Sequence, residues 1–165
     1  MLFRSEGGIY IHGNSFSDGL RNDHGTIQAT SAGYQGVIIA SNTFSGGVFN
    51  SGSIFGDNAT GLEITSNTFS GGIENTGTIS GDAPGLIVDV GNFTGDVNNS
   101  GLIQGFNADG ADLSGTNFQG SVINSGSIVG TSDGINIAFD NFDGDFNNQA
   151  DGEITGTRGA RIGGT

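Results

Sequence analysis

The sequence predicts an all-β fold, a parallel β-solenoid of about six coils with roughly 25 residues in each coil. Two observations lead to this prediction. A phrase of that length recurs along the chain, and apolar residues alternate with polar ones inside each copy. Glycine makes up 33 of the 165 residues, and helices are disfavoured because each internal glycine costs a helix about 1 kcal/mol. The repeat predicts a single domain over residues 1–165.

A phenylalanine marks the same position in every copy of the repeat. Successive members lie 28, 25, 24, 25 and 24 residues apart, and an aliphatic residue, or Phe146 in the last copy, follows four residues later. We assign both positions to the first strand of the coil and expect the phenylalanines to stack inside the solenoid. The column comprises Phe16, Phe44, Phe69, Phe93, Phe118 and Phe142.

Two further strands complete the predicted coil. The second centres on an isoleucine, and the third begins after a glycine with an aliphatic pair such as Leu62 and Ile64. One coil cannot bury its own inward face, whereas stacked coils share a narrow and continuous core. A spacing of about 4.8 Å per coil gives a rod of roughly 30 Å. The isoleucine column comprises Ile27, Ile54, Ile79, Ile103, Ile128 and Ile154.

An asparagine lies two residues after each aliphatic residue of the first strand, so alternation points it inward, at a corner of the coil. Asparagine tolerates left-handed backbone angles, and its amide can bond to the equivalent amide of the next coil. We interpret the column as a structural asparagine ladder rather than a row of ligand-binding groups. Its members are Asn22, Asn50, Asn75, Asn99, Asn124 and Asn148.

The composition excludes several partners and chemistries. The net charge is -13, from 17 acidic and 4 basic residues, and lysine is absent, so the chain should repel nucleic acid and anionic membranes. Cysteine is absent, which excludes disulfides and thiolate metal sites. The longest apolar runs are too short for a transmembrane helix. No motif indicates a cofactor, and we expect none.

The phrases NSGSIFG, NTGTISG, NSGLIQG and NSGSIVG are each followed by a turn and a glycine–aliphatic–x–aliphatic strand. They resemble the passenger repeats of bacterial autotransporters and haemagglutinins, over about residues 8–162. The resemblance implies a right-handed parallel β-helix, export, and an extracellular or cell-surface location. Passengers of that kind serve as adhesins, proteases or stalks. The N-terminal MLFRSEGG lacks the apolar core of a signal peptide, so we expect any export signal to lie elsewhere.

Catalysis on a parallel β-helix would need paired carboxylates across a cleft for hydrolysis, or a strong base with charge neutralisation for a lyase. The candidate acids are Asp109 with Asp112, and the cluster of Asp140, Asp143 and Asp145. Aspartates in Gly/Asn turns usually shape the turn. We therefore expect no catalytic site, and a carbohydrate-active enzyme stays as an alternative.

Metal and partner sites also have ordinary structural interpretations. We interpret His12 and His24 as isolated surface or corner residues rather than a metal pair. Outward apolar residues such as Phe49 and Phe55 are interrupted by polar residues such as Glu74, so we interpret them as scattered exposed side chains rather than a partner surface. Aspartates recur between the second and third strands, and we expect them to be hydrated turn carboxylates without a metal. They are Asp57, Asp82, Asp109 and Asp133.

The sequence favours a non-catalytic structural or adhesive module of an exported bacterial protein, acting as a stalk, scaffold or adhesin segment. The alternative is a filament or matrix subunit that self-associates end to end. It derives from the terminal repeats, where Leu2 can take the isoleucine-column position and Ala160 and Ile162 resemble a third strand without a polar cap. All four arginines lie in these terminal regions; they are Arg4, Arg21, Arg158 and Arg161.

Overall fold

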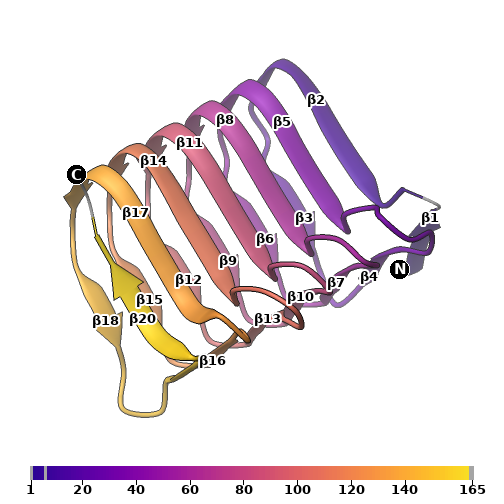
Figure 1. Ribbon diagram of the computed structural model, residues 1–165. Coiled ribbons are helices and arrows are strands. Elements are labelled where there is room, and N and C mark those ends of the chain that lie inside the picture. Colours follow the sequence, from indigo (N-terminus) through magenta and orange to yellow (C-terminus); the bar gives the residue numbers. More distant parts are fainter. Residues whose placement is uncertain (1, 6, 164–165) are drawn as a thin grey trace.

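The computed structural model describes residues 2–5 and 7–163, and all the regular secondary structure of these residues is β-strand (Figure 1). The chain winds through about six coils, and each full coil contributes one strand to each of three parallel sheets. Equivalent strands of successive coils pair in register, 24 or 25 residues apart over most of the chain, as Phe69 with Phe93 and Phe93 with Phe118. The predicted all-β solenoid is therefore confirmed.

One sheet, here called the phenylalanine sheet, contains the longest strands, and each phenylalanine lies at or near the end of its strand. We expected Phe44 and Val48 to share a strand, and this is wrong. A turn with positive φ at Gly46 and Gly47 separates them, since glycine alone reaches those angles without strain. The strands are β2 (Ile9–Phe16), β5 (Val37–Phe44), β8 (Leu62–Ser70), β11 (Leu86–Thr94), β14 (Ala111–Gln119), β17 (Asp133–Asp143) and β20 (Arg158–Ile162).

The asparagine sheet follows each of these turns with strands of three residues. An inward aliphatic residue and an inward asparagine flank one outward residue, as in Val48, Phe49 and Asn50. This pattern follows from the strand period of two. The strands are β3 (Leu20–Asn22), β6 (Val48–Asn50), β9 (Ile73–Asn75), β12 (Val97–Asn99), β15 (Val122–Asn124) and β18 (Phe146–Asn148).

The isoleucine sheet closes the coil and holds the isoleucine column. Its first strand pairs Leu2 with Thr26 and Phe3 with Ile27, so the expectation that Leu2 takes the isoleucine position is wrong by one residue. A shift of one residue moves a position to the opposite face of a strand. The strands are β1 (Leu2–Ser5), β4 (Thr26–Ala29), β7 (Ser53–Gly56), β10 (Thr78–Gly81), β13 (Leu102–Gly105), β16 (Ser127–Val129) and β19 (Glu153–Thr155).

The phenylalanine column runs through the core as a stack of nearly parallel rings. Successive ring centroids from Phe16 to Phe142 lie 4.7–5.4 Å apart, close to the spacing between coils. The four middle rings are buried, whereas Phe16 and Phe142 are only partly buried. The isoleucine column behaves in the same way, with five buried members and a partly buried Ile154 in the last coil.

Phe139 is a core residue that the repeat did not predict. Its ring is 1% exposed and packs against Phe118, with centroids 5.2 Å apart. The space for this ring exists because position 115 is glycine. A Cβ at Gly115 would lie 2.9 Å from the Phe139 ring and would collide with the carbonyl oxygen of Val90. A bulky residue in one coil is thus compensated by a missing side chain in the coil before it.

Replacing Phe93 with aspartate should abolish folding. The substitution places a carboxylate between the buried rings of Phe69 and Phe118, where nothing compensates the loss of hydration. The matched control is Phe106→Asp, because Phe106 is 44% exposed and its carboxylate would stay in water. Circular dichroism should show an unfolded Phe93→Asp chain and a folded Phe106→Asp chain. A folded Phe93→Asp protein with unchanged thermal stability would contradict the stacked core.

Candidate functional site

The asparagine column forms a continuous chain of side-chain hydrogen bonds through the solenoid. Each Nδ2 donates to the Oδ1 of the next coil, and the five donor–acceptor distances are 2.7–2.8 Å. Five of the six asparagines are buried, and Asn148, in the last coil, is exposed. All the amides therefore point the same way, and every bond joins two coils.

Backbone carbonyls complete the hydrogen bonding of each ladder amide. In the fourth coil, Asn99 Nδ2 also donates to the carbonyl oxygens of Gly101 (3.2 Å) and Ser127 (3.1 Å). Asparagine tolerates left-handed backbone angles, but the ladder residues do not adopt them. The described non-glycine residues with positive φ are His24 and Asn58, and the ladder asparagines instead end extended strands. The amide is therefore selected for its hydrogen bonds across coils rather than for its backbone freedom.

A second amide ladder lies on the outside of the phenylalanine sheet. Asn117 Nδ2 donates to Asn92 Oδ1 (2.8 Å), and Asn141 Nδ2 donates to Asn117 Oδ1 (2.9 Å). The same outward column continues with Thr68 and Thr43 in earlier coils. These residues are more exposed than the inner ladder, and their donors point in the opposite direction along the rod. The sequence repeat did not single out this ladder because hydroxyls replace amides in half of the column.

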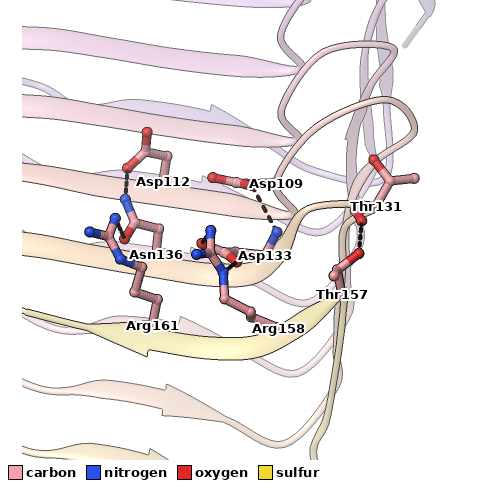
Figure 2. A network of polar contacts seen from close by, with 8 residues as sticks. All are labelled: Asp109, Asp112, Thr131, Asp133, Asn136, Thr157, Arg158 and Arg161. Carbon is pink, nitrogen blue, oxygen red and sulfur yellow. Dashed lines mark hydrogen bonds and ion pairs between the residues drawn. The ribbon is translucent and has the colours of Figure 1, made fainter.

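Two arginines of the last coil bind polar residues of the preceding coil, Arg158 to Asp133 and Arg161 to Asn136, as Figure 2 shows. Arg158, the first residue of β20, lies opposite Asp133, the first residue of β17. Its Nε donates to Oδ1 of Asp133 at 2.6 Å and its Nη2 to Oδ2 at 3.1 Å. Asp133 is 2% exposed, so our expectation of a hydrated turn carboxylate is wrong at this position. The hydrogen bond and the charge of Asp133 raise the pKa of Arg158.

The remaining contacts of this network join three successive coils. The Asp133 backbone N–H donates to Asp109 Oδ1 (2.9 Å). One column along, Asn136 Nδ2 donates to Asp112 Oδ1 (2.9 Å), and Arg161 Nη1 donates to Asn136 Oδ1 (3.4 Å) (Figure 2). The two arginines thus add side-chain hydrogen bonds to the backbone pairing of β20 with β17. Asp109 and Asp112 are structural acceptors for the β17 coil.

Burial raises the pKa of Asp112, and the negative charges of Asp109 and Asp89 act in the same direction. The hydrogen bond from Asn136 and the charge of Arg161 oppose this increase. The raised pKa means that folding disfavours the charged carboxylate relative to the unfolded chain. It therefore reflects a cost of holding Asp112 in this position.

The other candidate residues of the sequence lie apart from this network. Asp140, Asp143 and Asp145 are exposed in the last full coil, on β17 and the turn that follows it. His12 lies on β2 beside Tyr10, whereas His24 lies in a turn, where its backbone N–H donates to Ser51 Oγ. Among the described residues, no three His, Asp or Glu side chains gather as they would to hold a metal ion.

The outward face of the asparagine sheet carries two adjoining hollows that share Glu74 and Asn98. At one end, the Arg21 guanidinium lies 4.0 Å above the ring of Phe49, and its Nε bonds to Asp23 Oδ2 at 2.7 Å. Ile123 lines the other end. Glu74 and Asn98 separate Phe49 from Ile123 in this column, so the two apolar residues are not contiguous, although both line the hollows. The apolar members are 74 residues apart, so no local pattern connects them.

Comparison of the chain with protein-family models, with curated proteins and with solved structures finds no match. The described residues contain no apolar helix of membrane-spanning length.

Asn99→Ala should lower the free energy of unfolding by about 1–3 kcal/mol, because the Nδ2 of Asn75 and the Oδ1 of Asn124 lose a buried partner. Asn98→Ala is the matched control, since this neighbouring side chain points outward and should be nearly neutral for stability. Urea titration of both variants measures the difference. Equal losses from the two substitutions would show that the ladder contributes no more than a surface residue.

Asp112→Asn should stabilise the protein near pH 7, because it keeps the acceptor for Asn136 and removes a charge that folding disfavours. The pKa of Asp112 is higher in the folded state than its ordinary value of 3.8, so protonation favours folding as the pH falls. The advantage of the variant should therefore shrink with falling pH and be smallest below the ordinary value. Denaturant titrations of both proteins from pH 7 to pH 3 measure it, and an advantage independent of pH is the contrary outcome.

Proposed function

We propose that this chain is a non-catalytic structural or adhesive module, a rigid stalk or scaffold segment of an exported bacterial protein. One observation carries the proposal: the same side chains contact one another from coil to coil along the solenoid. The phenylalanine stack and the asparagine ladder each link six successive coils. A rod whose neighbouring repeats are joined in this way has stiffness along its axis and a length set by the number of repeats.

Export is supported by the sequence phrases that resemble autotransporter and haemagglutinin passengers, such as NSGSIVG at residues 124–130. The high acidic charge keeps the surface of such a rod from binding nucleic acid or anionic lipid without specificity. A spacer with these properties holds whatever is attached to it at a fixed distance from its anchor.

A coil deletion tests the spacer function. Removing residues 70–93 joins Phe69 directly to Thr94 and takes out one repeat with its asparagine and isoleucine rungs, while Gly115 stays beside Phe139. The shortened chain should fold and be about 4.8 Å shorter, measured by single-molecule energy transfer between dyes in the first and last coils. The chain should also resist bending far more than a Gly/Ser linker of equal length. A dye separation as broadly distributed as that of the linker would refute the spacer function.

A further inference from the structure

The hollowed outer face of the asparagine sheet forms a groove that crosses the strands and runs along the rod. Its floor is the outward column of β6, β9, β12 and β15, one residue from each coil. Register pairs these residues with one another: Phe49 with Glu74, Glu74 with Asn98, and Asn98 with Ile123. We call this column the asparagine-sheet groove. It presents an aromatic, a carboxylate, an amide and an aliphatic side chain at the spacing of the coils, about 4.8 Å.

The polar groups of the groove differ from three other stacked polar columns of the molecule. The inner asparagines, the outer asparagines and the Asp112 column each form hydrogen bonds from coil to coil. In the part of the chain that the structure describes, neither the Glu74 carboxylate nor the Asn98 amide has a hydrogen bond, although the two residues are direct neighbours. Their acceptors and donors therefore face the groove and are available to a ligand.

Apolar surface flanks these two polar residues on both sides. The ring of Phe49 lies beyond Glu74, and the side chain of Ile123 lies beyond Asn98. Arg21 is held in place by the Phe49 ring and by Asp23, so its guanidinium is oriented at the start of the groove. Asp96 lines the same hollow, and its Oδ1 is already occupied by the backbone N–H of Ser121 (2.8 Å). A ligand would meet apolar contact, then polar groups, then apolar contact along one line.

We propose that the asparagine-sheet groove binds an extended neutral oligosaccharide. Such a chain presents hydroxyl groups at its ring edges and C–H groups at its ring faces, which complements a row of carboxylate and amide groups between apolar residues. Its rings repeat at a distance similar to the coil spacing of about 4.8 Å, so successive sugars can meet successive coils. The proposal deepens the adhesive form of the proposed function by naming its ligand class.

Charge and geometry separate this ligand from two other classes. A net charge of -13 repels sulfated or otherwise polyanionic glycans. A peptide strand binds by adding to an open sheet edge, whereas the groove lies across paired strands whose backbone groups already bond to their neighbours. Outward side chains and the glycines Gly46 and Gly71 line the groove, and a polyhydroxyl chain suits such a surface.

The test uses the whole chain and a panel of neutral hexasaccharides, made of β-1,4-linked glucose, β-1,4-linked N-acetylglucosamine or α-1,4-linked glucose. Isothermal titration measures binding, and amide chemical shifts locate it. We expect at least one of the three to bind and to shift the amides of β6, β9 and β12. Glu74→Ala and Asn98→Ala should each weaken binding at least tenfold. Glu74→Gln, which keeps the shape and hydrogen-bonding capacity of the side chain, should lose less than Glu74→Ala.

Gln104→Ala is the matched control, because Gln104 points outward from the isoleucine sheet in the same coil as Asn98 and should leave binding unchanged. Circular dichroism verifies that each variant is folded. No binding to any hexasaccharide of the panel overturns the proposal. So does equal weakening by Gln104→Ala, or binding restricted to a heparin hexasaccharide or a cationic peptide. The spacer function is measured independently by the coil deletion, so its result stands whichever outcome is found here.

Discussion

Register between coils is the constraint on which the rest of the structure depends, and the inner asparagine ladder is the interaction that specifies it most sharply. A shift of one residue along a strand would expose the apolar side chains, and it would also point Asn75 or Asn99 outward and break two buried hydrogen bonds for each of them. The phenylalanine rings stack in the same register. The asparagine ladder and the phenylalanine stack therefore both depend on one repeat length, and insertions or deletions of residues are accommodated in the turns.

The sequence was sufficient to predict the sheets and their inward columns because identical residues recur at a fixed interval. It was insufficient where the residues at equivalent positions of successive coils are unlike. The turn at Gly46 and Gly47 was missed because apolar alternation continues on either side of it. The ion pair of Arg158 with Asp133 breaks the repeat rather than following it, and only the register reveals that these residues are opposite one another.

Phe139 illustrates the same limit within the core. Its column holds Ser66, Val90 and Gly115 in the preceding coils, so no shared chemistry marks the position as inward. The groove on the asparagine sheet is a similar case, because its floor changes residue type in every coil. Most inward positions are constrained by stacking and therefore repeat, whereas the Phe139 column and the outward positions differ from coil to coil. The candidate binding surface consequently lies where the repeat is least regular.

The most direct test of the account is nuclear magnetic resonance of the labelled chain, which observes the side-chain amides of the asparagines. The account predicts cross-peaks between the side-chain amide protons of Asn75, Asn99 and Asn124, slow exchange of these protons with solvent, and parallel backbone contacts between residues 24 or 25 apart. Side-chain amides that exchange as fast as those of a free asparagine, or backbone contacts of antiparallel hairpins, would contradict it.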